Sequence, residues 1–270
     1  MSTSGLMKGK RGLIMGVANN HSIAWGIAEA LHKAGAELAF TYAGETFKKR
    51  VEPLVAPLNP AAVMDCDVTQ QSSIDAAFAE LKTKWDSIDF LVHAIAFSDK
   101  NQLQGRYIDT TPENFQNTLN ISAYSFTAVA QRAEKMMTKG GSMVTLTYYG
   151  AEKVMPHYNV MGVAKAALEA ITRYMAEDLG KQNIRVNSIS AGPIKTLSFA
   201  GISDSRYILK WNELNSPLRR AVTIEEVGNT ALFLLSDLGS AVTGENIHVD
   251  AGYHAIGMKA VDAPDIATVK

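Results

Sequence analysis

Two side chains that could hold different parts of one elongated ligand, Tyr158 and Lys165, lie seven positions apart. On a helix this spacing puts both on one face, roughly 10 Å apart along the axis. A phenol has an ordinary pKa near ~10, so it is a poor proton donor at neutral pH unless a cation or a polarising ligand assists it. A second phenol, Tyr148, precedes Tyr158 by ten positions. These residue types predict stabilisation of a developing negative charge beside a bound nucleotide.

A competing pair, Tyr149 and Lys153, has the shorter spacing Tyr-x3-Lys. Pro156 follows three residues after Lys153, and a proline interrupts a helix interior. We therefore expect this pair on a strand end and loop. Because a rigid helix positions a catalytic pair better, Tyr158 and Lys165 are the favoured pair.

The stretches that must position these side chains alternate between short apolar runs and longer helical patterns. Strands are expected at 11–15, 37–42, 62–66, 88–95, 142–146, 184–189 and 246–250. Helices are expected at about 23–34, 45–56, 70–85, 113–137, 158–179 and 223–236. This alternation is typical of an α/β fold, a doubly wound, Rossmann-like parallel sheet of about seven strands. We expect one domain over residues 1–270, with 1–9 and 261–270 flexible.

Composition narrows the class of protein. A net charge of −1 disfavours nucleic acid and a basic membrane-binding surface as partners. No apolar run approaches the ~18 residues that span a bilayer, and the first residues lack the apolar stretch of a secretory signal. The single cysteine, Cys66, excludes an intrachain disulfide and fits a reducing compartment. We therefore expect a cytoplasmic protein, and the histidine spacing predicts no metal site.

A glycine after the first expected strand, Gly16, could let the backbone approach a phosphate. The standard Gly-x-Gly-x-x-Gly is absent, so this loop by itself indicates a dinucleotide only weakly. Ser22 is a good N-cap for the next helix, and its hydroxyl could also meet a phosphate. After the second strand no cation stands directly beside Ala43, which favours NADH over a 2′-phosphorylated cofactor.

The pattern Tyr148-x9-Tyr158-x6-Lys165, together with Gly16-x5-Ser22-Ile23, resembles the bacterial NADH-dependent enoyl-[acyl-carrier-protein] reductases. These are a divergent branch of the short-chain dehydrogenase/reductases, and the resemblance covers roughly residues 10–260. It implies reduction of the trans-2 double bond of enoyl thioesters on acyl carrier protein during fatty acid elongation, in a homotetramer.

The resemblance also implies roles for residues. The catalytic group would be Tyr158, Tyr148 and Lys165. Cofactor binding would fall to Gly16, Ser22, Ile23, Ala43, Asp67, Val68, Ile95, Lys165, Ile194, Lys195, Thr196, Leu197 and Ser198. The acyl site would be lined by Phe97, Ser98, Met161, Phe199, Ile202 and Tyr207. A helical lid would cover it from around 195–217, an amphipathic stretch. For Asp67, a plain turn role remains an alternative.

Two other functions stay open. A ketone or 3-oxoacyl thioester reductase of the common branch would need a serine thirteen residues before Tyr158, where this chain has Thr145. It would also need a lysine at Gly162. A non-catalytic dinucleotide sensor could share the fold, because a fold does not fix a function.

Overall fold

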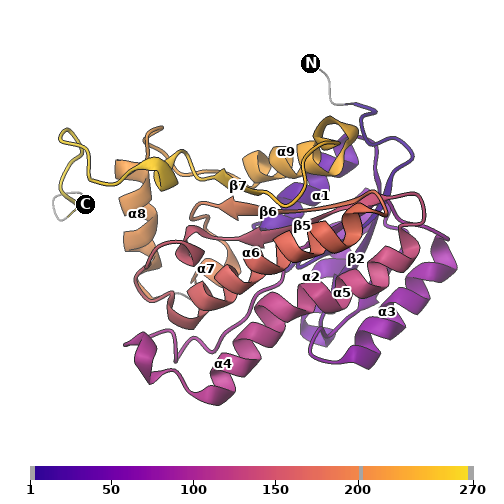
Figure 1. Ribbon diagram of the computed structural model, residues 1–270, viewed down its shortest axis with the longest axis horizontal. Helices are drawn as coiled ribbons and strands as arrows, with labels where there is room; N and C mark the ends of the chain where they lie inside the picture. The colour runs from indigo at the N-terminus through magenta and orange to yellow at the C-terminus, as the bar shows by residue number, and fades with distance from the viewer. Residues whose placement is uncertain (1–3, 201–202, 267–270) are drawn as a thin grey trace.

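The structure, a computed structural model, describes residues 4–200 and 203–266. Strands and helices alternate along the chain (Figure 1). The strands are β1 Arg11–Met15, β2 Glu37–Tyr42, β3 Val63–Asp65, β4 Phe90–His93, β5 Gly141–Thr147, β6 Ile184–Ala191 and β7 Asn246–Val249. The α-helices are α1 Ile23–Lys33, α2 Glu45–Val55, α3 Gln71–Lys84, α4 Pro112–Leu119, α5 Ser125–Ala133, α6 Asn159–Gly180, α7 Leu197–Ala200, α8 Ser205–Asn215 and α9 Ile224–Leu235.

The seven strands form one parallel sheet in the order β3-β2-β1-β4-β5-β6-β7. The chain winds outward in one direction from β1 to β3 and in the other from β4 to β7. In such a sheet, ligands bind outside the carboxyl ends of the strands where the order reverses, here between β1 and β4. The predicted doubly wound, Rossmann-like sheet is confirmed.

Helices cover both faces of the sheet, because parallel strands are apolar on both sides. One hydrophobic cluster joins α3, α5 and α6 to the sheet, with Phe78, Phe126 and Leu168 in its interior. A second joins α1, α2 and α9 to the opposite face, with Leu31 and Val227 buried there. Figure 1 shows α4, α5 and α6 on one side and α1 and α9 on the other. The sheet is therefore held rigidly from both faces.

The strand register brings the predicted site segments to one edge. Met15 pairs with His93, and His93 pairs with Thr145, so the segments after β1 and β4 leave the sheet at the same level, and β5 continues two residues beyond it to Thr147. The fourth strand ends at His93, two residues before the predicted end. Ala94 and Ile95 leave the sheet there and enter the loop that lines the cavity described below.

The predicted helix over 113–137 is interrupted. A π-helical turn, Asn120–Tyr124, separates α4 from α5. The hydroxyl of Ser122 in this turn donates to the Phe97 carbonyl oxygen (3.0 Å) and accepts from the Phe97 backbone N–H (2.9 Å). Such π turns inside α-helices often mark functional sites. Here the turn fixes the loop that follows β4.

Helix α9 opens with a capping box: the Thr223 hydroxyl accepts from the Glu226 backbone N–H, and the Glu226 carboxylate accepts from the Thr223 backbone N–H. Residues of both ends that were expected to be flexible make contacts with the rest of the chain. Met7, within the predicted loose arm, is fully buried, and Asp262 pairs with Arg219 at 3.0 Å.

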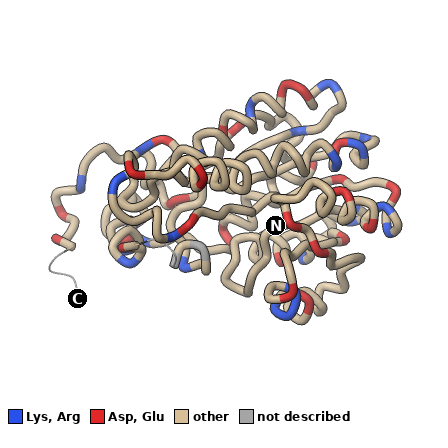
Figure 2. The backbone as a smooth tube through the Cα atoms, turned by 90° about the horizontal axis from the view of Figure 1, so that it is seen from below, with Lys and Arg blue, Asp and Glu red and all other residues tan. Residues whose placement is uncertain are grey.

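None of the described helices is long and apolar enough to cross a membrane. In the view of Figure 2, Lys and Arg lie interspersed with Asp and Glu along the backbone.

Candidate active site

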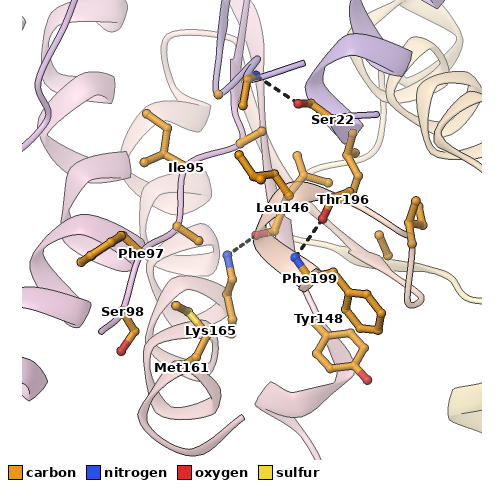
Figure 3. A pocket seen from close by; sticks show the side chains of 18 of the residues that line it. Ser22, Ile95, Phe97, Ser98, Leu146, Tyr148, Met161, Lys165, Thr196 and Phe199 are labelled. Carbon is orange, nitrogen blue, oxygen red and sulfur yellow. Dashed lines mark hydrogen bonds between the residues drawn. The ribbon is translucent and has the colours of Figure 1, made fainter. Parts of the chain in front are cut away.

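A cavity of about 680 Å³ opens at the carboxyl ends of β1, β4, β5 and β6. Its walls come from segments far apart in the sequence that the sheet register brings together. Phe97, Ser98 and Met161 lie on one side, and Tyr148 and Phe199 on the other (Figure 3). The predicted site residues in its lining are Gly16, Ser22, Ile23, Ile95, Phe97, Ser98, Tyr148, Tyr158, Met161, Lys165, Ile194, Thr196, Leu197 and Phe199.

The loop after β1 requires a glycine at position 16. Gly16 has φ +102°, a left-handed conformation, and an added Cβ would lie 2.1 Å from the Ala94 carbonyl oxygen. Only glycine adopts this backbone without strain and permits this approach. The loop therefore packs tightly between β1 and β4 and leads to the N-terminus of α1, the kind of place where backbone N–H groups meet phosphates.

Ser22 holds this loop but does not cap α1 with its side chain. It occupies the N-cap position without a side-chain capping bond. Its hydroxyl oxygen instead accepts backward from the N–H groups of Ala18 (3.0 Å) and Asn19 (3.1 Å). The predicted capping bond is therefore wrong, because the tight loop offers nearer donors. In the first turn of α1 the Trp25 N–H donates to the Ser22 carbonyl oxygen at 3.0 Å, and the N–H groups of Ile23 and Ala24 before it point out of the helix end toward a ligand.

Lys165 reaches the cavity from α6 and is almost fully buried. Its Nζ donates to the carbonyl oxygen of Leu146 at 2.7 Å, beside the end of β5 (Figure 3). Burial lowers the pKa of Lys165 to about 8, and the negative charge of Glu169 opposes that shift. The ammonium is thus charged at neutral pH but close to losing its proton.

Tyr158 stands at the N-cap of α6, so it precedes the helix and does not lie within it as predicted. The turn that includes His157 (φ +56°) and Asn159 (φ +40°) delays the helix by one residue. Tyr158 packs edge-on against Tyr148, with ring centroids 5.0 Å apart. Burial raises the pKa of both phenols well above the ordinary value. Both therefore stay protonated at neutral pH and are able to donate a hydrogen bond to a ligand.

The Tyr148 hydroxyl is buried without a hydrogen-bond partner among the described residues. It lies on the side of its ring that faces away from Lys165 (Figure 3). A buried phenol usually finds a partner, so this hydroxyl is suited to a polar group of a ligand or to a rearranged network with Tyr158.

A family model described as Enoyl-(Acyl carrier protein) reductase matches residues 16–254. The chain belongs to this family. It is 68% identical to Enoyl-[acyl-carrier-protein] reductase [NADH] 1 of Rhizobium meliloti, with 99% of this chain and 98% of that protein covered. The second such reductase of that organism is 59% identical, with 98% of each chain covered.

A solved structure supports the same assignment. It is the enoyl-[acyl-carrier-protein] reductase of Anaplasma phagocytophilum in complex with NAD, at 59% identity and a TM-score of 0.93. The match covers 98% of this chain and 100% of that one. The family resemblance stated from the sequence is thereby confirmed.

The competing pair, Tyr149 and Lys153, lies outside the lining of the cavity. Tyr149 is buried, and its hydroxyl donates to the His254 carbonyl oxygen at 3.2 Å. Lys153 is exposed, and neither residue is among those that line the cavity. The expectation that this pair sits on a strand end and loop is confirmed, since Tyr149–Ala151 forms a 3₁₀ turn directly after β5.

Thr145 does not reach the cavity as the serine of a ketone reductase would need to. It is fully buried, and its hydroxyl donates to the His93 carbonyl oxygen and contacts the His93 ring at 3.0 Å. Burial and the nearby charge of Lys165 lower the pKa of His93 to about 3. His93 is thus a neutral histidine packed in the core.

Five predicted residues lie outside the lining of this cavity: Ala43, Asp67, Val68, Lys195 and Tyr207. Asp67 serves a turn, since its Oδ1 accepts from the N–H (2.9 Å) and hydroxyl (2.8 Å) of Thr69. Tyr207 stacks on Trp211 in α8. Ser198 belongs to α7. Ile202 lies outside the described residues.

Several lining residues were not predicted. Phe47 of α2, Lys100 and Leu103 line the cavity, as does Thr147 at the end of β5. Thr147 lies one position before Tyr148, at the end of a strand, and this position could have predicted that it lines the cavity. The other three come from a helix and a loop whose local patterns do not show which way they face.

Proposed function

We infer that the chain catalyses the NADH-dependent reduction of the trans-2 double bond of enoyl thioesters in fatty acid synthesis. The observation that carries this inference is one cavity shared by the Gly16 loop, Lys165 and the Tyr158–Tyr148 pair. A nucleotide loop, a buried cation and two protonated phenols are the parts that such a reduction needs.

The cavity walls fit NADH. The positive φ of Gly16 and its close approach to the Ala94 backbone let the loop pack against the segment after β4, beside the N-terminus of α1. The N-terminus of α1 beside it suits a pyrophosphate. We propose that Lys165 holds the nicotinamide ribose hydroxyls and that the backbone near Ile194 and Thr196 meets the carboxamide. When bound, NADH supplies the hydride that reduces the β-carbon.

Tyr158 is the proposed donor to the thioester oxygen, where negative charge develops as the double bond is reduced. A donor aimed at this oxygen stabilises the transition state more than the ground state. The charge of Lys165 favours the same anion. Because Tyr158 is buried and protonated, it offers a hydrogen bond without first losing its proton. Tyr148 supports Tyr158 through their edge-on contact.

The acyl chain is proposed to lie among Phe97, Met161 and Phe199. Leu197 and Phe199 come from α7, and α8 follows as the second helix of the predicted lid over 195–217. Ile208 and Leu209 anchor α8 by burial. A helical cover over an apolar wall suits an acyl substrate and excludes water from the developing anion.

We propose that the substrate is carried by acyl carrier protein, an acidic partner that Lys195 and Arg206 could meet beside the cavity. Both side chains are exposed, whereas the nearby Lys210 of α8 pairs with Glu213 at 3.4 Å. In the variant Lys195→Glu/Arg206→Glu, KM for the carrier-bound substrate should rise severalfold while KM for a coenzyme A thioester stays constant. An equal change for both substrates would argue against this docking site.

We also propose that residues 1–270 form one domain, that four copies assemble, and that the protein works in the cytoplasm. One sheet connects β1 to β7, which supports a single folding unit. Exposed apolar residues on α6, including Tyr174, support assembly between copies. Cell fractionation tests the location: enrichment in a periplasmic or membrane fraction would contradict it.

The test of function follows the loss of NADH absorbance with a crotonyl thioester and, separately, an acetoacetyl thioester. We expect turnover of the crotonyl substrate with NADH and little with NADPH. Turnover of the acetoacetyl substrate alone would identify a ketone reductase. NADH binding without turnover of either substrate would identify a sensor.

A further inference from the structure

Behind the wall of the cavity lies a carboxylate that the mechanism has not used. Glu169 is on α6, four positions after Lys165, so the two side chains share one face of the helix. Its exposed fraction is 9%, and that of Lys165 is 6%. Buried carboxylates are costly unless they are hydrogen-bonded or paired, so a buried Glu169 calls for a partner.

Glu169 is fixed from the strand side. The hydroxyl of Thr147, the last residue of β5, donates to Glu169 Oε1 at 2.7 Å. Thr147 lines the cavity, and Leu146 just before it accepts the bond from Lys165 Nζ. The end of β5 therefore anchors the ammonium and the carboxylate through adjacent residues.

We propose that Glu169 is a positioning residue, whose buried carboxylate, held by Thr147, keeps the Lys165 ammonium charged and in place for the cofactor. The two charges act through space, because each makes its hydrogen bond to β5. At a low effective dielectric, opposite charges about one helical turn apart interact strongly. The proposal rests on the proposed function for the identity of the cofactor.

The charges around the pair agree with this role. Glu169 opposes the lowering of the Lys165 pKa that burial causes. The pKa of Glu169 itself is raised, mainly by burial and further by the charge of Glu152 after β5. The bond from Thr147, His248 on β7 and Arg173 on α6 lower this pKa and so favour the charged carboxylate. His93 of β4, whose pKa is lowered by burial and by the charge of Lys165, is neutral at physiological pH.

The test measures NADH binding by nicotinamide fluorescence from pH 6 to 9 for the wild type and for Glu169→Gln, which keeps the shape and removes the charge. At pH 6, Lys165 is charged in both proteins and the affinities should agree within about twofold. At pH 8.5 the variant should bind about three- to tenfold more weakly, because a one-unit fall in the Lys165 pKa changes the charged fraction by up to tenfold. Glu169→Asp should keep most of the wild-type profile.

A merely structural role for Glu169 would weaken binding equally at every pH, and that result would overturn the proposal. If Glu169→Gln does not fold, the comparison of Thr147→Val with Thr147→Ser tests the same proposal, because only the first variant removes the hydroxyl that holds Glu169. Loss of the hydroxyl in Thr147→Val should weaken binding selectively at high pH, whereas Thr147→Ser should not. Parallel profiles for the two Thr147 variants would overturn the proposal.

The binding readout separates this inference from the proposed function. Wild-type protein that binds NADH but leaves a crotonyl thioester unreduced would contradict the function and leave the Glu169 result interpretable. Wild-type protein that reduces the thioester, with unchanged pH dependence in Glu169→Gln, would contradict only the role of Glu169.

Discussion

Tyr158 and Lys165 have opposite responses to the same burial. Taking a phenol out of water disfavours its anion, and taking an ammonium out of water disfavours its cation. Tyr158 therefore holds its proton more firmly, while Lys165 holds its proton less firmly. Together they supply a neutral hydrogen-bond donor and an ammonium that loses its proton just above neutral pH. The pH range in which this site works therefore depends mainly on Lys165.

Replacement of Tyr158 by phenylalanine should lower kcat for a crotonyl thioester by about 100-fold or more, the usual effect of losing one oxyanion donor. NADH affinity should change less than about twofold, since Tyr158 is proposed to face the thioester. Tyr149→Phe is the matched control, because Tyr149 is also buried but lies outside the cavity lining. Full turnover in Tyr158→Phe would remove Tyr158 from the mechanism.

NADH binding to the free enzyme should weaken as the pH rises through about 8, where Lys165 loses its charge in the native state. The ordinary lysine pKa is 10.5, so between these values the unfolded chain holds the extra proton. The contribution of Lys165 to stability therefore rises with pH in this window, while binding falls by up to about tenfold per unit.

Fluorescence titration of NADH at a series of pH values checks this dependence. Lys165→Arg should bind without the decline, because a guanidinium stays charged throughout. Lys153→Met, which removes an exposed lysine of the competing pair, should keep the wild-type profile. A decline that persists unchanged in Lys165→Arg would assign it to another group.

At the scale of elements, the cavity depends on how chain segments leave the sheet. The Gly16 loop packs against Ala94, and the π turn holds Phe97 through Ser122. Both contacts restrain the segment after β4, one at Ala94 and the other at Phe97. The walls are thus positioned by backbone contacts, which tolerate less change than contacts between flexible side chains.

Gly16→Ala should destabilise the protein by about 1–3 kcal/mol, since it combines a left-handed φ with a close contact to Ala94. NADH affinity should fall about tenfold or more, equivalent to one charge-assisted hydrogen bond lost from the phosphate loop. Gly5→Ala is the control: its φ is +87°, with nothing within 4 Å of the added Cβ. Thermal unfolding and NADH titration measure both effects; equal behaviour of the two variants would contradict the loop argument.

At the scale of the whole molecule, α6 serves two surfaces. Its inner face carries Lys165 and Glu169, while Val163 and Tyr174 are exposed on its outer face, with Tyr174 77% exposed. Their spacing of eleven residues places them on the same side of the helix. Large exposed apolar groups on a helix that also builds the site favour burial against another copy.

Tyr174→Asp should therefore reduce the assembly of four 29.2-kDa chains to smaller species, because it places a charge in an apolar contact. Light scattering coupled to size-exclusion chromatography measures the mass. Ile108→Asp, at a residue that is 78% exposed in a different element, should leave the assembly intact. A wild-type mass of one chain would refute the proposed tetramer.

The sequence by itself determined the alternation of strands and helices, the edge of the sheet where ligands bind, and the membership of Tyr158 and Lys165 in one site. These depend on local periodicity, on turn residues and on spacing along one helix, all of which are present in the chain before it folds. The bounds of β1 and β2 were predicted to the residue.

Only the tertiary structure decided the roles of Ser22, Asp67 and Glu169. The Ser22 hydroxyl turned back to its own loop, and Asp67 to Thr69. Glu169 was one more acidic residue on a long helix until Thr147 and Lys165 were placed beside it. A polar side chain bonds to the nearest well-oriented partner, and the strength of its charge depends on burial. Both are set by segments that meet only when the sheet forms.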